Sequence, residues 1–517
     1  MKRNAPEFSA SQNNKRIAKN TLMLYFRMIL TMLVALYTSR VVLNTLGVED
    51  FGIYNVVGGV ISLFSFITAS MSSATSRFLT YTLGRNDLQE LKEVFKASFT
   101  IHLFIALILF ILAETAGLWF LNNKLIIPKN RMQAAQFIYH TAVIGAIFSI
   151  VQVPYTASIF SHEKMDIYAY FEIFITTLKL IIVISLTYIA YDKLITYAFL
   201  LLGVNIVSFL LYAFYSSKNF TECRYGISKN KEILRPMLSF SGWDLYGNMS
   251  TVARTQGVNM LLNIFFGPVL NAAYGIATSV QSAVNAFSGN VLTAVRPQIV
   301  KSYANNEINY TIQLLNNTAK FTTILLLFII IPISIEMPFI LKIWLKNVPE
   351  YTNIFCILTL GFILFANLST IIMSAIHATG KIKKSSLWNG TLYLSVIPLA
   401  YFAFKQHTSP VIPFVLNLFF VAIGWNLNMW YLKMYMPQFS IKSFYKKSIL
   451  PPLLVGVIAF AISILLYLFF DQGWIRLILV FLVSSTTILS ITYFFVLTSN
   501  QRILIQSRLK RKFHSHD

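Results

Sequence analysis

The chain reads RVVLNTLGVEDFGIY over residues 40–54, and this short stretch joins two apolar segments that are each long enough to span a bilayer. Gly47 and Gly52 bracket a four-residue connection, because glycine permits the positive φ values that such a tight turn needs. Glu49 and Asp50 precede the next helix and can cap its exposed N–H groups. The stretch therefore predicts a hairpin of two long membrane helices.

Long apolar segments continue through the rest of the chain. Of the 517 residues, 56% are hydrophobic and only 12% are charged, which is roughly half the charged fraction of a soluble protein. In lipid, a backbone must satisfy its own hydrogen bonds within each segment, so we predict an all-α polytopic membrane protein. The spans, about fourteen in number, are predicted over residues 20–46, 50–83, 94–121, 131–160, 165–190, 194–215, 232–265, 268–296, 312–341, 351–379, 385–404, 409–434, 446–470 and 473–498.

The distribution of charge predicts the orientation. The net charge of +23 arises from 42 Lys and Arg against 19 Asp and Glu. With the N-terminus in the cytoplasm, most of these cations fall in inner connections, as the positive-inside rule requires, and both termini are then cytoplasmic. The basic tail that contains Arg508 and Arg511 is expected to contact anionic membrane lipids. It lacks the aromatic or groove-reading elements of a nucleic-acid-binding segment, so we expect no nucleic acid as a partner.

An internal repeat divides the chain. Matching residues recur at an offset of about 220 residues, and an even number of spans in each repeat places both in the same orientation. The arrangement predicts two six-helix bundles, residues 1–220 and 221–435, related by a pseudo-two-fold axis along the membrane normal, followed by two additional helices and the basic tail in residues 436–517. The matches are Leu43 with Leu262, Gly47 with Gly267, Tyr54 with Tyr274, Arg77 with Arg296, Asn86 with Asn306, and the inner turns 161–164 and 379–382.

Cations outnumber acids within the predicted spans. A charge at membrane depth is costly, so it normally faces a bundle interior or a water-filled cavity and serves a function. The excess of cations indicates an interior suited to a negatively charged ligand. The six cations are Arg27, Arg40, Arg77, Lys179, Arg254 and Lys320, and the four acids are Glu114, Glu172, Asp244 and Glu336.

Residues 40–54 resemble the Leu-Gly, acidic, aromatic-Gly-x-aromatic turn of bacterial polysaccharide flippases. The predicted spans form two groups of six, followed by two more. In this arrangement the chain is similar to O-antigen and capsule repeat-unit translocases of the multidrug/oligosaccharidyl-lipid/polysaccharide exporter superfamily. This resemblance implies the fold of the multidrug and toxic-compound exporters (MATE-like) and a place in a bacterial inner membrane. The implied function is alternating-access flipping of an isoprenoid-pyrophosphate-linked oligosaccharide for polysaccharide biosynthesis. Implied partners are that lipid-linked oligosaccharide, membrane lipids and other polysaccharide-assembly membrane proteins.

The resemblance also implies that the helices over 20–46, 50–83, 232–265 and 268–296 line a central cleft, where five arginines lie at two depths. Arginine binds phosphate oxygens bidentately and stays charged, which suits a pyrophosphate. The alternative for Arg77 and Arg296 is to snorkel to inner headgroups, and Arg40 can snorkel outward or hold the first hairpin. The inner set is Arg27, Arg77 and Arg296, and the deeper set is Arg40 and Arg254.

Asp244 completes the predicted substrate site. It lies in a polar, glycine-containing stretch, residues 239–248, that is unusual for a membrane span. Two interpretations stay open, namely coupling to substrate or an ion, and a static ion pair with Arg27 or Arg40. Supporting cavity residues, for most of which interhelical hydrogen bonding is the alternative, are Lys179, Glu172, Asn55, Asn248 and Tyr246.

Other functions are less compatible with the sequence. A membrane polymerase or glycosyltransferase needs paired carboxylates or sizeable outer loops, so we predict no enzyme and no catalytic residue. The seven histidines have no metal-ligand spacing, and we expect no metal or cofactor; proton or sodium coupling stays open. A multidrug exporter of the same fold is the stronger alternative. Such exporters bind cations and use an acid in the first helix, where this chain has Arg27 and Arg40.

Overall fold

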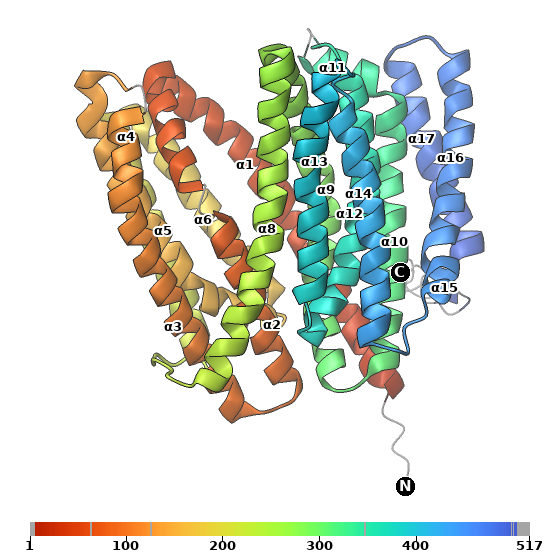
Figure 1. Ribbon diagram of the computed structural model, residues 1–517, viewed down its shortest axis with the longest axis horizontal. Helices are drawn as coiled ribbons and strands as arrows, with labels where there is room; N and C mark the ends of the chain where they lie inside the picture. Colours follow the sequence, from red (N-terminus) through yellow and green to blue (C-terminus); the bar gives the residue numbers. More distant parts are fainter. Residues whose placement is uncertain are drawn as a thin grey trace, which may run out of the picture. The chain divides into compact units, whose positions relative to one another are not determined.

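A computed structural model describes residues 6–62, 65–124, 127–345, 348–497, 499 and 501–503, and over these ranges the backbone forms helices and no strand (Figure 1). The side chains of Arg40 and Asn55 lie outside the described part. The earlier helices are α1 (Pro6–Ser62), α2 (Ser65–Gly84), α3 (Leu88–Leu112), η1 (Ala113–Gly117), α4 (Leu118–Lys124), η2 (Lys129–Arg131), α5 (Met132–Ser161), α6 (Met165–Ser185), η3 (Leu186–Tyr188) and α7 (Lys193–Asn219). The later helices are α8 (Lys231–Phe266), α9 (Pro268–Ala304), α10 (Ile308–Ile335), α11 (Met337–Leu345), α12 (Thr352–Thr379), α13 (Lys383–Lys405), α14 (Ile412–Tyr435), α15 (Ile441–Phe444), η4 (Tyr445–Ile449), α16 (Leu450–Phe469), α17 (Trp474–Ile491) and η5 (Thr492–Val496).

The chain is a multi-pass helical membrane protein, as the sequence predicts. Within the described residues, 11 helices are long and apolar enough to cross a bilayer. That set does not include α8 and α9, although they contain 36 and 37 residues. Both are rich in serine, threonine and asparagine, and polar membrane helices of this kind normally face other protein rather than lipid.

Two helical segments of α1 meet within residues 40–54. They meet at Gly47, which has φ 80° and ψ 169°, outside the helical region, as a connection between two helices requires. The prediction that Asp50 caps the following helix is replaced by a different role, because its carboxylate accepts hydrogen bonds from Arg131 Nε and Nη2 at 2.8 and 2.5 Å. The same guanidinium also binds Asp192, the N-cap of α7, so three segments are joined at one end of the bundle.

The backbone supports the internal repeat. Positive φ angles occur at residues about 220 positions apart, and each pair lies at the equivalent bend or inner turn of its half. Asparagine and glycine tolerate this conformation better than other residues, so matched positions indicate matched local folds. The pairs are Gly47 with Gly267 (80° in both), Asn86 with Asn306 (56° and 59°) and Glu163 with Gly380 (58° and 75°).

Packing divides the chain into two compact units. The first comprises Met1–Val252, Thr293–Glu307 and His377–Gly390, so it includes the ends of α9 and α12 and the start of α13. Helix α5 contacts α1, α2, α3, α6 and α7 of this unit. The sequence-based boundaries at 220 and 435 divide the chain differently and stay a prediction.

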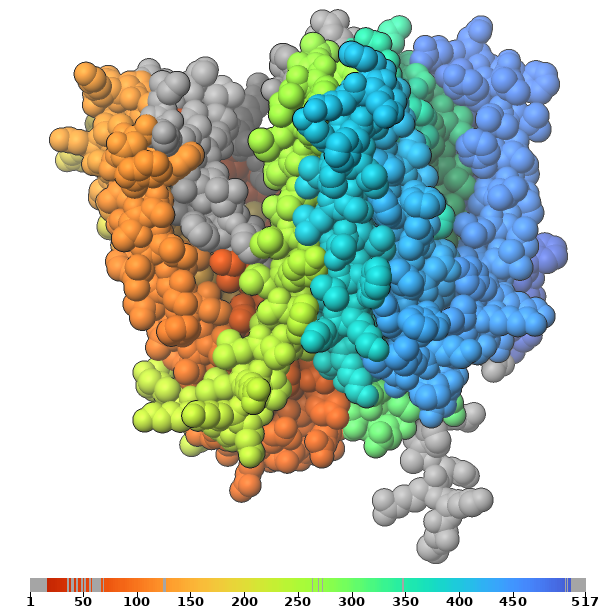
Figure 2. Space-filling model, in the orientation of Figure 1, coloured from red at the N-terminus to blue at the C-terminus, as the bar shows by residue number. Residues whose placement is uncertain are grey.

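The second unit comprises Ala253–Leu292, Ile308–Ile376 and Thr391–Asp517. Its core joins the second half of α8 and the first half of α9 to α10, α12, α13 and α14, through buried residues that include Leu262, Phe355 and Val396. The hairpin of α16 and α17 packs against α10 and forms an outer flank of this unit (Figure 2). It exposes large apolar side chains such as Phe469 and Ile475, as expected for a surface in contact with lipid.

Candidate functional site

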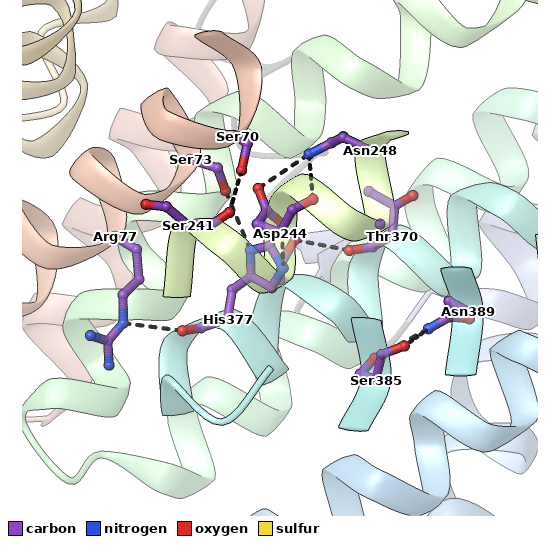
Figure 3. Close-up of polar contacts among 12 residues, drawn as sticks. Ser70, Ser73, Arg77, Ser241, Asp244, Asn248, Thr370, His377, Ser385 and Asn389 are labelled. Atoms are coloured by element: carbon purple, nitrogen blue, oxygen red, sulfur yellow. Dashed lines mark hydrogen bonds and ion pairs between the residues drawn. The ribbon is translucent and has the colours of Figure 1, made fainter. Parts of the chain in front are cut away.

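A polar cluster surrounds Asp244 inside the first unit, where α2, α8 and the end of α12 meet (Figure 3). Asp244 is only 8% exposed. Its Oδ1 lies 3.5 Å from His377 Nε2, and its Oδ2 accepts a hydrogen bond from Asn248 Nδ2 at 3.3 Å. Arg27 does not form the predicted static pair with Asp244, because its Nη1 donates to Tyr168. The alternative pair with Arg40, whose side chain lies outside the described part, stays a prediction.

Serines of α2 complete the surroundings of this carboxylate. Ser73 Oγ lies 3.5 Å from His377 Nδ1, and Ser70 Oγ donates a hydrogen bond to the carbonyl oxygen of Ser241 at 2.9 Å. Buried polar groups are stable only when paired in this way, so the cluster joins α2, α8 and α12 by interlocking hydrogen bonds (Figure 3).

Two arginines add positive charge to the cluster. Arg296 interacts electrostatically with both Asp244 and His377. Arg77 donates from Nε and Nη2 to the carbonyl oxygens of His377 and Ala378, each at 3.2 Å. Two cations around one acid leave a net positive charge, which is expensive at membrane depth and typical of a functional site.

Arg77 is packed rather than extended toward headgroups. Its guanidinium lies over the rings of Phe78 at 4.5 Å, Tyr81 at 4.8 Å and Phe240 at 5.8 Å from the centroids. Such cation–π contacts and the two carbonyl acceptors satisfy the group inside the unit. The structure therefore favours an interior position for Arg77 over snorkelling.

Arg254 lies in the second unit and has a different environment. It is 6% exposed, its Nη1 donates to Asn417 Oδ1 at 3.2 Å, and the guanidinium stacks over Tyr393 at 4.5 Å and Phe362 at 4.9 Å. Among the residues that the structure describes, no carboxylate forms an ion pair with it. A buried cation without a counter-ion is destabilising, so its retention points to a function.

A small cavity opens beside this arginine. Its volume is ≈ 30 Å³, which is enough for one or two water molecules and far too small for a sugar. The described residues that line the cavity supply hydroxyl and amide groups but no acid. Arg254 is the only charged residue among them. The lining residues are Arg254, Thr255, Tyr274, Thr278, Gln281, Leu358, Thr359, Phe362, Phe414 and Asn417.

Arg27 belongs to a third polar group, formed by α1, α6 and α7. Its Nη1 donates to Tyr168 Oη at 2.9 Å, while its Nε is buried without a hydrogen-bond partner. Tyr212 Oη donates to Glu172 Oε1 at 3.0 Å, and the rings of Tyr168 and Tyr212 lie 6.4 Å apart. The two tyrosines thus connect Arg27 with Glu172. Lys179, predicted as a supporting residue, is exposed.

The structure brings together only part of the predicted site. Arg77, Asp244, Asn248 and Arg296 share one cluster, Arg27 and Glu172 share another, and Arg254 lies in the second unit. Tyr246 packs on α13, where a side chain at Gly390 would lie 2.4 Å from its ring. Several partners were not predicted from the sequence. The only features that point to them are the serine-rich run 70–76 and a histidine just before the turn that follows α12. These residues are Ser70, Ser73, Tyr168, Phe362, His377, Tyr393 and Asn417.

Within the part of the chain that the structure describes, no group of three or more His, Cys, Asp or Glu is arranged to hold a metal ion. No family model matches this sequence, and no curated protein matches it either.

Solved structures share the fold. An outward-facing multidrug resistance MATE family transporter of the MOP superfamily superimposes with a TM-score of 0.71 at 14% identity, covering 82% of this chain and 96% of that one. A MATE transporter in a bent conformation has the same TM-score and identity over 84% and 97%. A Pyrococcus furiosus MOP superfamily transporter, described as having a binding pocket of reverse polarity, gives 0.68 at 14% identity over 82% and 96%. The chain therefore has the MATE-like transporter fold.

Proposed function

We propose that this protein is a flippase that moves an isoprenoid-pyrophosphate-linked oligosaccharide across a bacterial cytoplasmic membrane by alternating access. The observation that carries the proposal is the buried charge of Arg254, for which the described residues supply no carboxylate. A pyrophosphate group supplies the missing negative charge, and the planar guanidinium can bind it bidentately. No bond is made or broken, so no catalytic group is required.

The positive clusters of the first unit support the same substrate class. Arg77 and Arg296 outnumber Asp244, and Arg27 has a buried donor, Nε, without a hydrogen-bond partner. Tyrosines and amides beside these cations, such as Tyr168 and Asn248, are the groups that bind sugars through ring stacking and hydrogen bonds. An anionic head with an attached oligosaccharide fits this combination better than a lipophilic cation does.

The structures that share this fold are compatible with an anionic substrate. MATE transporters include multidrug exporters, while the Pyrococcus furiosus relative is described with a reversed pocket polarity that suggests a different function. The fold is therefore compatible with more than one charge preference. In this chain the described residues around Arg254 favour an anion.

A multidrug exporter is the second candidate. The comparisons with MATE family transporters favour it, and Asp244 supplies one buried carboxylate that can attract a cation. Its weakness is electrostatic, because the positive charge of Arg296 already acts on Asp244.

Reconstituted vesicles can decide between these functions. A fluorescent isoprenoid-pyrophosphate oligosaccharide is added with the protein, and its arrival in the outer leaflet is followed by accessibility to a non-permeant glycosidase. We expect Arg254→Gln to slow flipping by about 10- to 100-fold, since a charge-assisted hydrogen bond contributes about 1.5–3 kcal/mol. Arg254→Lys keeps the charge but loses the bidentate geometry, so its rate is expected to be intermediate.

The matched control is Lys229→Ala, which removes a cation from an exposed loop and is expected to leave the rate unchanged. Ethidium efflux is measured in the same vesicles. Flipping by Arg254→Gln at the wild-type rate, at equal protein level, would refute the role of Arg254. Ethidium efflux without glycolipid flipping would establish the multidrug alternative instead.

A further inference from the structure

Glu163 is a fully buried acid of the first unit. It lies in the turn between α5 and α6 at φ 58°, and its side chain is 0% exposed. Its carboxylate pairs with Arg16 Nε of α1 at 2.8 Å and accepts hydrogen bonds from Lys301 Nζ at 2.8 Å and Gln298 Nε2 at 2.5 Å, both of α9. A buried carboxylate is tolerated only with such full pairing, so this turn is fastened to α9 and α1.

Arg77 fastens the corresponding turn of the second repeat. It binds the last carbonyl oxygens of α12, those of His377 and Ala378, and its guanidinium fills the space that a side chain at Gly380 would need. A Cβ on Gly380 would lie 2.7 Å from Arg77 Nη2. The turn between α12 and α13 is therefore fastened to α2.

The two contacts are reciprocal. In the internal repeat, turn 161–164 corresponds to turn 379–382, and Arg77 on α2 corresponds to Arg296 on α9. Turn 161–164 of the first repeat thus binds α9 of the second, and turn 379–382 of the second repeat is bound by α2 of the first. Between the two contacts α2 and α9 touch directly, since a Cβ on Gly84 would lie 3.1 Å from Lys301 Cα and from Ala304 Cβ.

We propose that these contacts form a double latch that holds the cytoplasmic end of the protein closed, and that both halves of the latch must release before the protein opens inward. The proposal rests on the transporter function proposed above and on the predicted orientation. The latch is polar and its members are stable in water, so release exposes Glu163 and Arg77 to solvent rather than leaving them unpaired in lipid. A polar latch can therefore open and close, whereas an apolar core contact of equal area would resist separation.

Thiol labelling tests the latch without any substrate. A single cysteine replaces Ser73, which lies one helical turn before Arg77 on α2, in a background where Cys223 and Cys356 are changed to serine. A membrane-impermeant maleimide is applied from the cytoplasmic side. We expect slow labelling with the latch intact and labelling at least about tenfold faster with Glu163→Gln or Arg77→Gln, which corresponds to about 1.4 kcal/mol in the opening equilibrium.

The matched control breaks the ion cluster of Arg131 with Asp50 and Asp192, which lies at the end of α5 opposite to Glu163. Arg131 lies just before the 30-residue α5 and Glu163 just after it, roughly 45 Å apart at 1.5 Å per residue. Arg131→Gln is therefore expected to leave cytoplasmic labelling at position 73 unchanged. Equal acceleration by Arg131→Gln would attribute the effect to general loosening and overturn the latch.

A disulfide keeps the proposal testable if the latch variants fail to fold. Gly84→Cys with Ala304→Cys places two thiols where α2 and α9 touch. Oxidation is expected to stop movement of the labelled glycolipid, and reduction is expected to restore it; full transport with the disulfide formed would overturn the latch. If the labelling results agree with the latch while no glycolipid moves in any variant, the proposed substrate is wrong and the latch stands.

Discussion

Alanine at Gly380 gives a quantitative test of the contact between Arg77 and the turn after α12. Gly380 has φ 75°, a conformation that costs an L-residue about 1 kcal/mol. The new Cβ would also lie 2.7 Å from Arg77 Nη2, so the guanidinium must move by about 0.7 Å to reach an ordinary contact of 3.4 Å. Its bonds to the two carbonyl oxygens are already 3.2 Å long, and this movement breaks at least one of them.

A hydrogen bond from a charged donor contributes about 1.5–3 kcal/mol, so we expect Gly380→Ala to lower the free energy of unfolding by about 3 kcal/mol in total. Gly267→Ala is the matched control. Gly267 has φ 80° and nothing lies within 4 Å of its added Cβ, so only the backbone cost of about 1 kcal/mol remains. Unfolding is measured in mixed detergent micelles by intrinsic fluorescence, at equal protein and lipid content.

A double-mutant cycle separates the steric effect from other causes. In an Arg77→Ala background the guanidinium is absent, so Gly380→Ala is expected to cost only the backbone term, about 1 kcal/mol. Equal losses for Gly380→Ala and Gly267→Ala, or an unchanged loss for Gly380→Ala without Arg77, would refute the reasoning.

Two further predictions concern ion pairs outside the proposed substrate site. Glu336→Gln breaks a buried pair in which Arg476 donates to both carboxylate oxygens, at 2.8 and 3.1 Å, so we expect about 3–5 kcal/mol of destabilisation and proteolysis of the α16–α17 hairpin before the rest of the chain. Equal protease resistance in the variant and the wild type would contradict this anchoring role. Asp192 has a pKa below its usual range because Arg131 and the first N–H groups of α7 bind its carboxylate. Its stabilisation is present above the unfolded-state pKa of about 3.9 and is lost as pH falls through the lower folded-state pKa, so Asp192→Asn is expected to flatten the acid side of a plot of melting temperature against pH. An acid side as steep as that of the wild type would exclude this carboxylate as the cause.

Many helix positions follow from the sequence because most membrane spans are marked by their length and apolarity. The span predicted over 351–379 is α12 (Thr352–Thr379), and the span predicted over 409–434 is α14 (Ile412–Tyr435). The repeat is also visible in the sequence, since Gly47 matches Gly267 and Asn86 matches Asn306, and all four residues have positive φ. Span length, apolarity and the φ angles of turns depend on residues that are close together in the sequence, so they can be predicted without knowing how the helices pack.

Partners across helices do not follow from the sequence in this way. Asp50 precedes a helical segment and was predicted to be a cap, yet Arg131, 81 residues later, binds its carboxylate. For Asp244 the sequence left open coupling to substrate or an ion and a static pair with Arg27 or Arg40, and it gave no indication that His377 lies beside it. Hydropathy shows that a side chain is buried but not which helix lies opposite, because many helix arrangements bury the same apolar surface. The predicted arginines were therefore easier to identify than their neighbours.

Arg254 and Arg476 have contrasting environments, and for this reason only Arg254 is proposed as a binding group. Both residues are 6% exposed, and both guanidinium groups lie over aromatic rings. Arg476 has a bidentate carboxylate partner in Glu336, so its charge is neutralised within the protein. Among the described residues, Arg254 contacts an amide and two rings, and the residues that line the cavity beside it include no acid. Because an unneutralised buried cation lowers stability, the function proposed above assigns the counter-charge of Arg254 to an anionic substrate.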